Sequence, residues 1–217
     1  MTVYPLSALV IAAVGTVGLV IHSTLPRTGK IRPGMFCFYT NQSNLLVVLY
    51  ELALFTAWLL RAGAVYQLLV SPNVAMAVAA CIWITHLIYH FVLVPWIRRT
   101  GGTFADSAEE RTGNVLVHYI TPLMTLLQWL LWADKSLNVW SAVWWLLLPL
   151  GYFAYAMLRA RSGKPIGRTD LLYPYPFLDY PTLGPKKFWL GIGRLLVFYF
   201  ALGLVLVGAG RLILLLG

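Results

Sequence analysis

The chain has 217 residues, of which 60% are hydrophobic and only 11% are charged, and its mean hydropathy is +0.77. A soluble domain carries about 25% charged residues, so this composition excludes an ordinary soluble fold and predicts a polytopic membrane protein. The net charge of +9 does not call for nucleic acid as a partner, because the basic residues cluster between apolar segments and no nucleic-acid-binding motif is present.

Successive apolar segments are each roughly 20 residues long or longer, enough to cross a ~30 Å hydrocarbon core. We expect six such spans, over residues 4–25, 35–60, 71–96, 114–133, 137–158 and 188–216. They predict an all-α membrane protein, a bundle of six transmembrane helices in a single domain covering residues 1–217. The first segment lacks a basic n-region and is long enough to span, so we expect no cleavable signal peptide.

Basic residues are distributed unequally between the two sets of connections. The first, third and fifth connections hold 3, 3 and 6 Lys or Arg residues, whereas the opposite side holds only Arg61, Lys135 and Arg211. The positive-inside rule therefore places the odd-numbered connections in the cytoplasm and both termini outside. Residues 134–136 read as a tight connection between the fourth and fifth spans.

A polar block interrupts the apolar pattern at the mouth of the second span. It consists of Thr40, Asn41, Gln42, Ser43 and Asn44. In hydrocarbon each of these side chains needs a protein partner, because lipid offers no hydrogen bonds. The block predicts a protein-lined polar pocket.

The histidines converge on the same half of the membrane as Thr40. Counted at 1.5 Å per residue, His22, His86, His90, His118 and Thr40 lie roughly 5–15 Å from the face of the odd-numbered connections. His86 and His90, at i and i+4, could bind a metal ion, or they could hydrogen-bond to neighbouring helices and line a site. No carboxylate or Cys stands at ligand spacing, so we expect no metal and no cofactor.

Two polar stripes run at helical spacing along the second and fourth spans. The first comprises Thr40, Asn44 and Glu51, and the second comprises His118, Thr121, Thr125 and Gln128. Glu51 and Gln128 fall at similar depth, near the midplane. An intramembrane carboxylate is a functional candidate that should face the bundle interior, although Glu51 could instead join helices through hydrogen bonds.

Two features that contain proline complete the candidate site. Pro122 cannot donate a hydrogen bond to the His118 carbonyl, so we expect the fourth span to kink there and free that carbonyl. Residues 173–181, Tyr-Pro-Tyr-Pro-Phe-Leu-Asp-Tyr-Pro, are stiff and display aromatic side chains on the same side as Thr40. This loop could be a lid or an interfacial anchor, and Asp179 could orient a histidine or remain a solvated charge.

Three motifs, in this order on six spans, resemble the androgen-induced membrane proteins and their bacterial six-span relatives. They are Phe38-Tyr-Thr-Asn-Gln-Ser-Asn44, then His118 followed by Thr121-Pro122, then Tyr175-Pro-Phe-Leu-Asp179. Animal members of that family are threonine hydrolases that cleave fatty acid esters of hydroxy fatty acids. The resemblance implies that Thr40 is the nucleophile and His118 the essential histidine. Residues 41–44 are closer to the bacterial branch, which implies a bacterial plasma membrane, and Asp179 stands where animal members tend to have Glu.

The chemistry of these residues is compatible with a hydrolase. A threonine hydroxyl needs an adjacent base, and His118 could take its proton and pass it to the leaving group. An amide of Asn41, Gln42 or Asn44 could donate to the oxyanion. We expect the substrate to be a lipid ester that enters sideways from the cytoplasmic leaflet, with its tails among the second to fourth spans and with membrane lipids as its surroundings.

Two other functions fit the same pattern. The stripes could form the path of a transporter or the site of a lipid-binding protein without catalysis, although the chain shows no repeats or paired broken helices. The histidines could also hold a haem or a metal ion, with His90 and His118 as an axial pair. The sequence leaves the oligomeric state open.

Overall fold

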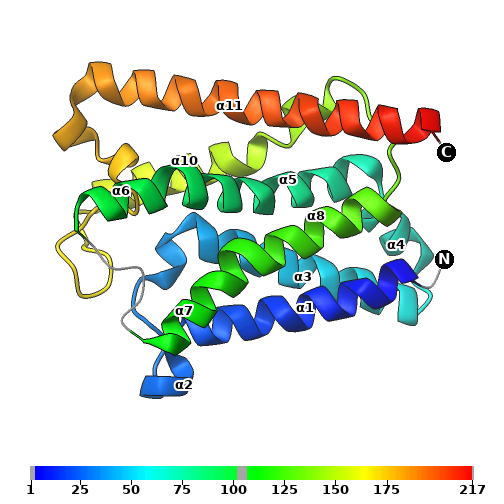
Figure 1. Cartoon of the computed structure of the whole chain (residues 1–217), viewed down its shortest axis with the longest axis horizontal. Coiled ribbons are helices and arrows are strands. Elements are labelled where there is room, and N and C mark those ends of the chain that lie inside the picture. Colours follow the sequence, from blue (N-terminus) through cyan, green and yellow to red (C-terminus); the bar gives the residue numbers. More distant parts are fainter. Residues whose placement is uncertain (1–2, 102–106, 217) are drawn as a thin grey trace.

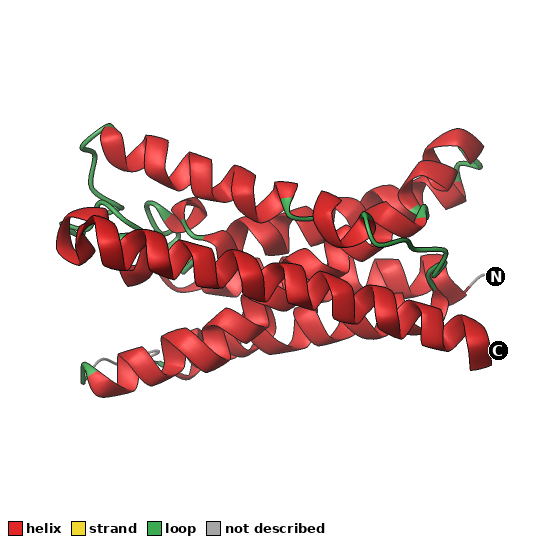
Figure 2. Cartoon of the chain, turned by 90° about the horizontal axis from the view of Figure 1, so that it is seen from above, coloured by secondary structure: helices red, strands yellow, loops and turns green. Residues whose placement is uncertain are grey.

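The computed structural model describes residues 3–101 and 107–216, and all regular secondary structure in these ranges is helical (Figure 2). Six helical segments within them are long and apolar enough to cross a membrane. The protein is therefore an integral membrane protein with several spans, and its fold is the all-α six-helix bundle that the sequence predicts (Figure 1).

The spans lie where hydropathy places them, with shifts at their ends. They are α1 (Val3–His22), α3 (Tyr39–Leu59), the continuous run α5, η2 and α6 (Pro72–Ile88, Tyr89–Leu93, Val94–Arg99), the continuous run α7, η3 and α8 (Ala108–Val115, Leu116–Ile120, Thr121–Trp132), the pair α9 and α10 (Ser141–Trp144, Leu147–Arg161), and α11 (Tyr180–Leu216). Short helices in the connections are α2 (Leu25–Thr28), η1 (Met35–Cys37), α4 (Gly63–Leu69) and η4 (Pro176–Leu178).

Capping residues account for two of the shifted helix starts. The fourth span begins at Ala108, earlier than expected, because the Ser107 hydroxyl accepts a hydrogen bond from the Glu110 N–H at 3.1 Å. The helix α11 begins at Tyr180, because the Asp179 carboxylate accepts from the Thr182 N–H at 3.3 Å and from the Thr182 hydroxyl at 2.7 Å. Its helical conformation breaks at Gly184 (φ 71°, ψ 163°), so the uninterrupted helix of the sixth span starts at Pro185. Helix caps of this kind extend a helix beyond its apolar part into the polar interface.

The connection between the fourth and fifth spans is longer than predicted. The fifth span begins at Ser141, because the Asn138 side-chain oxygen accepts from the Trp140 N–H at 2.9 Å and from the Ser141 N–H at 3.3 Å. This turn holds the residues before Ser141 out of the helix. The connection is therefore longer than the tight one expected at residues 134–136, and the chain crosses between the two spans in a non-helical segment.

The helices form two groups. One group consists of α1, α3, α5 and the run from α7 to α8, which pack on one another; α9, α10 and α11 pack onto α5 as the second group. Both termini lie at one end of the bundle, and the first, third and fifth connections lie at the other end (Figures 1 and 2). The junction between the two groups is where the site described below is found.

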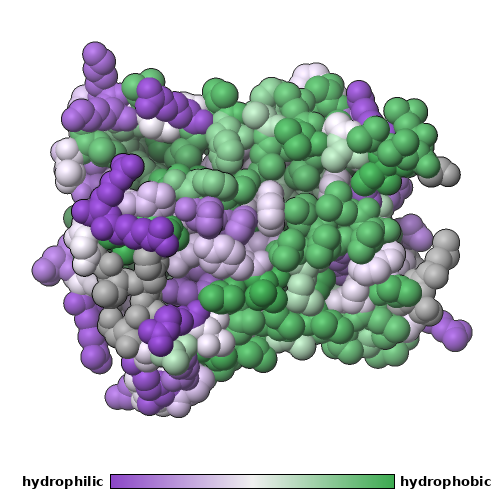
Figure 3. Space-filling model, viewed as in Figure 1, coloured by the Kyte–Doolittle hydropathy of each residue, from purple (hydrophilic) through white to green (hydrophobic). Residues whose placement is uncertain are grey.

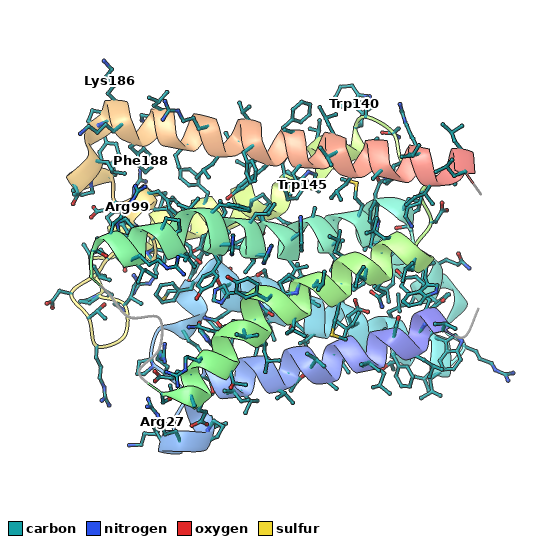
Figure 4. The ribbon with its side chains drawn as sticks, in the orientation of Figure 1. Arg27, Arg99, Trp140, Trp145, Lys186 and Phe188 are labelled. Carbon is teal, nitrogen blue, oxygen red and sulfur yellow. The ribbon has the colours of Figure 1, made fainter. Side chains whose placement is uncertain are left out.

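Glycines allow the closest helix contacts. A Cβ atom at Gly18 of α1 would lie 3.0 Å from the Leu116 Cβ, and one at Gly203 of α11 would lie 3.0 Å from the Ala142 backbone. A Cβ at Gly203 would also press on the indole nitrogen of Trp145, which lies beside α11 in Figure 4. Small residues at such crossings let helix backbones approach in a membrane, where packing rather than the hydrophobic effect holds helices together.

We expect Gly203→Ala to destabilise the protein by about 1–3 kcal/mol, because the new methyl group overpacks the contact between α11 and α9. Gly208→Ala is the matched control: it lies on the same helix, and a Cβ there meets no atom within 4 Å. Both changes carry the same intrinsic gain in helix propensity. Thermal unfolding in detergent, followed by tryptophan fluorescence, should give Gly203→Ala a lower melting temperature than wild type and Gly208→Ala an equal or higher one. Equal melting temperatures for the two variants would contradict the prediction.

Polar residues gather at the end that carries the odd-numbered connections, whereas hydrophobic residues cover most of the remaining visible face (Figure 3). Arg27, Arg99 and Lys186 project from that end (Figure 4). The first connection is tied to the start of α7 there by Glu110, whose carboxylate lies 2.6 Å from the Arg27 guanidinium and 3.7 Å from that of Arg32.

Lys135, in the connection between the fourth and fifth spans, is buried. It is only 4% exposed, and its ammonium group donates to the carbonyls of Trp129 and Ala133 at the end of α8. A lysine in this position satisfies carbonyls that the helix terminus leaves free. On the side of the termini, Arg61 and Arg211 are the exposed basic residues among those counted for that side.

Candidate active site

Thr40 and His118 meet inside the bundle. The Thr40 hydroxyl oxygen lies 3.3 Å from the His118 Nε2, and both residues are buried. Thr40 is the second residue of α3, and His118 lies in η3, so the two come from the second and fourth spans. The convergence in depth that the sequence indicates is thus a direct contact.

The hydrogen bonds of His118 define its tautomer. Its Nδ1 lies 3.0 Å from the Asn114 carbonyl oxygen. Since a carbonyl only accepts, Nδ1 must carry the ring proton, and Nε2 is left with a free lone pair. That lone pair faces the Thr40 hydroxyl, which is the orientation in which a histidine can accept the hydroxyl proton.

Pro122 shapes the helix around His118 as expected. The kink takes the form of a π-helical turn over Leu116–Ile120. Pro122 has no N–H to offer the His118 carbonyl, and this carbonyl instead accepts a hydrogen bond from the His86 Nδ1 at 2.9 Å. His86 therefore holds the backbone of His118 in place from the neighbouring third span.

We expect His86→Phe to destabilise the protein by about 1–3 kcal/mol, because it leaves the His118 carbonyl without a partner while keeping an aromatic ring against Trp83. In a Pro122→Ala background the same change should cost less than half as much, since alanine supplies the N–H that proline lacks. A double-mutant cycle on thermal or denaturant unfolding measures this coupling. Equal costs in both backgrounds would show that the carbonyl does not depend on His86.

The other aromatic contacts complete the surroundings of His118. The Tyr89 ring stacks on His118 with 3.6 Å between centroids, and the His22 ring stands edge-on to it at 6.1 Å.

His90 is exposed and its Nδ1 lies 3.0 Å from the Tyr119 hydroxyl. Both ring nitrogens of His118 are engaged, so the axial haem pair of His90 and His118 would have to break the contact with Thr40. Within residues 3–101 and 107–216, no three His, Cys, Asp or Glu side chains gather as a metal site would require.

The amides of the polar block bind backbone carbonyls. The Asn41 side chain donates to the Met35 carbonyl at 2.7 Å, and the Gln42 side chain donates to the Phe36 carbonyl at 2.7 Å. Both bonds fold the segment before α3 back onto the first turn of that helix. These residues thus position the start of α3, and their amide groups donate to this segment, which does not support the oxyanion role considered for either of them.

Asn44 and Ser43 hold Thr40 from the other side. The Asn44 amide donates to the Thr40 carbonyl at 2.8 Å and to the Val117 carbonyl at 3.0 Å, so both of its N–H groups are occupied. The Ser43 hydroxyl lies 3.1 Å from the Thr40 carbonyl and 2.8 Å from the Thr85 hydroxyl. Asn44, one of the three amides considered as an oxyanion donor, therefore has no N–H left for that role. Together these contacts lock α3 against η3 and fix the distance between nucleophile and base.

Glu51 and Gln128 form a separate polar cluster. Gln128 donates to the fully buried Glu51 carboxylate at 3.0 Å and to the Ser7 hydroxyl at 3.2 Å, joining α1, α3 and α8. The equal depth inferred for the two residues is confirmed. Glu51 lies three turns beyond Thr40, about 16 Å along the helix, and it does not line the cavity beside Thr40. The contacts match the alternative in which Glu51 joins helices.

The loop of residues 173–181 enters the bundle. Tyr175 and Leu178 are buried, and they pack with Phe188 and Ile192 of α11. The Tyr175 hydroxyl oxygen lies 3.4 Å from the Thr40 N–H nitrogen. Asp179 contacts no histidine among the described residues, because its carboxylate caps α11 as described above. The loop is thus an inner wall of the site rather than an outer lid.

A largely apolar cavity adjoins Thr40. It lies between α5, η2, α10, η4 and α11, with Tyr39 and Thr40 of α3 at its inner wall. Its volume is about 70 Å³, which is small beside the roughly 300–1,000 Å³ of typical small-molecule sites. The cavity is bounded by the third, fifth and sixth spans. Of the second to fourth spans, among which we expect the lipid tails, the second and third line this cavity and the fourth contributes no residue to it.

Aromatic residues of the site were missed from the sequence. Tyr89 covers the His118 ring, and Tyr152 of α10 donates to the Cys37 carbonyl at 2.9 Å, next to the start of α3. Tyr175 lies in the motif Tyr175-Pro-Phe-Leu-Asp179, which by itself indicates no role for its hydroxyl. Tyrosine hydroxyls within apolar spans need partners, and this is the signal that could have identified them.

Comparisons of the chain with protein-family models, with curated proteins and with solved structures find no match. The class of the protein therefore rests on its own fold and site. It is an integral membrane protein whose six-helix bundle brings a hydroxyl and an imidazole together at the wall of an apolar cavity.

Proposed function

We propose that the protein is an intramembrane threonine hydrolase that cleaves carboxylic esters of lipids, such as fatty acid esters of hydroxy fatty acids. The observation that carries this proposal is the 3.3 Å contact between the Thr40 hydroxyl and the His118 Nε2. The apolar cavity beside Thr40 supports a lipid as the substrate. The motif resemblance described above points to the same reaction.

The reaction would proceed in two halves. In the first, the Thr40 Oγ attacks the ester carbonyl carbon while His118 Nε2 takes the hydroxyl proton. The tetrahedral intermediate then collapses, the bond to the leaving alcohol breaks, and the alcohol leaves with the proton from Nε2. In the second half, His118 takes a proton from water as the water attacks the acyl-Thr40 carbonyl, and the proton returns to Thr40 as the free acid departs.

The site would work in the cytoplasmic leaflet. Thr40 lies in the first turn of α3, at the end that carries the basic odd-numbered connections, and the positive-inside rule assigns that end to the cytoplasm. A lipid ester would lie with its carbonyl at Thr40 and one chain in the apolar cavity. We propose the plasma membrane of a bacterium as the location, on the basis of the motif resemblance.

The test is hydrolysis of a fatty acid ester of a hydroxy fatty acid by the purified protein in detergent or nanodiscs, with the released fatty acid measured by mass spectrometry. A fluorophosphonate probe should react covalently with the protein, and peptide mapping should find the adduct on Thr40. Transport of the intact ester into liposomes, with no hydrolysis of a broad panel of lipid esters and no adduct, would reject the proposal in favour of a transporter.

A further inference from the structure

The proposed reaction creates a negative charge that none of the expected side chains is placed to receive. When the Thr40 Oγ attacks, the carbonyl oxygen becomes an oxyanion, and donors aimed at this oxygen usually supply a large share of catalysis. The Asn44 amide has both N–H groups on backbone carbonyls, and those of Asn41 and Gln42 are turned toward the segment before α3. The donors must come from elsewhere around Thr40.

The first donor is the backbone N–H of Thr40 itself. Thr40 is the second residue of the 21-residue helix α3, so its N–H has no partner inside the helix. The next two N–H groups, of Asn41 and Gln42, donate to the Phe38 carbonyl at 3.2 and 3.3 Å. The Thr40 N–H instead points to the Tyr175 hydroxyl oxygen. The positive end of the α3 dipole therefore lies beside the nucleophile, where it favours an anion.

The second donor is the hydroxyl of Tyr175. Its oxygen is 3.4 Å from the Thr40 nitrogen, so a single oxygen atom could lie within about 2.7–3.1 Å of both, which is the separation an oxyanion requires. Tyr175 is only 8% exposed and lines the same cavity as Thr40. Burial raises the pKa of the Tyr175 phenol, so the group stays protonated at neutral pH and can donate.

Packing holds the Tyr175 ring in this position. The ring stacks on Phe177 with 5.1 Å between centroids and an interplanar angle of 6°, and Phe38 stands edge-on to it at 5.9 Å. Phe38 is the residue directly before α3, so the ring and the helix terminus are fixed relative to each other. Such a donor needs little reorganisation as charge develops, and the apolar cavity strengthens its interaction with an oxyanion.

We propose that the Tyr175 hydroxyl and the Thr40 N–H together form the oxyanion-binding site, which makes Tyr175 a catalytic residue. This inference rests on the proposed hydrolase function. As the Thr40 Oγ bonds to the carbonyl carbon, the carbonyl π electrons move to the oxygen, which accepts a hydrogen bond from each donor. When the intermediate collapses, the electron pair re-forms the C=O bond, and Tyr175 keeps its proton throughout.

The test compares Tyr175→Phe with Tyr4→Phe in the full-length purified protein. Tyr4 is another buried tyrosine, on α1; its hydroxyl contacts that of Tyr50 at 3.4 Å, and it does not line the cavity. We expect Tyr175→Phe to lower kcat about 10²–10³-fold while KM stays within about threefold, and Tyr4→Phe to leave both within about threefold. Thr40 should still be labelled by the fluorophosphonate in Tyr175→Phe, more slowly but to completion, which shows that the variant is folded.

A second variant separates hydrogen bonding from packing. Tyr175→4-aminophenylalanine keeps the ring and restores an N–H donor. Its kcat should therefore be at least about tenfold higher than that of Tyr175→Phe. An unchanged kcat in Tyr175→Phe, or equal losses in both variants, would overturn the role of Tyr175 while leaving Thr40 and His118 as the hydrolytic pair. A wild-type protein that neither hydrolyses lipid esters nor reacts at Thr40 would overturn the proposed function, and this inference with it.

Discussion

Thr40→Val should abolish ester hydrolysis, with kcat falling about 10⁴–10⁶-fold, as is typical when a catalytic nucleophile is removed. Valine keeps the branched shape of threonine and removes only the hydroxyl that lies 3.3 Å from His118. The fluorophosphonate adduct should disappear at the same time. Hydrolysis is measured by release of the free acid, and labelling by peptide mass spectrometry.

Two further variants control for effects other than the loss of the nucleophile. Thr40→Ser keeps a hydroxyl beside His118 and should retain both turnover and labelling. Thr125→Val removes another buried threonine hydroxyl, which donates to the Thr121 carbonyl within α8, and should lower stability slightly without changing kcat. If Thr40→Val and Thr125→Val were equally active, Thr40 would not be the nucleophile.

His118→Phe should lower kcat by a similar factor of about 10⁴–10⁶, because His118 is the imidazole that lies within reach of the Thr40 proton. The phenyl ring keeps the stacking on Tyr89, which holds the position of the ring. The rate of fluorophosphonate labelling at Thr40 should fall as well, since an unassisted threonine hydroxyl is a weak nucleophile.

His90→Phe is the matched control for His118, because His90 is exposed and its Nδ1 pairs with the Tyr119 hydroxyl rather than with Thr40. It should keep kcat within about threefold. The double variant of Thr40→Val and His118→Phe should be no slower than either single variant, since residues that act as one unit have non-additive effects. Additive losses, or full activity of His118→Phe, would show that the two residues do not work together.

The sequence determined the features that depend on position along the membrane normal. Hydropathy located the spans, and counting residues from their ends placed Thr40 at the level of His118 and Glu51 at the level of Gln128; both pairs are in contact in the structure. The missing N–H of Pro122 predicted that the His118 carbonyl lacks its partner within the helix, and in the structure this carbonyl accepts a hydrogen bond from His86. These inferences succeed because helix rise and proline chemistry are local properties of the chain.

Only the tertiary structure decided which faces of the helices meet. The spans are apolar on nearly every side, because lipid and protein interior are equally apolar, so hydrophobic periodicity does not reveal which face points inward. The cavity between the third, fifth and sixth spans, the carbonyl partners of Asn41 and Gln42, and the approach of Tyr175 to Thr40 all depend on the rotation and lateral neighbours of helices. The pattern of residues along one segment determines how deep each residue lies in the membrane. The rotation of a helix and the identity of its neighbours follow from packing between segments far apart in the chain.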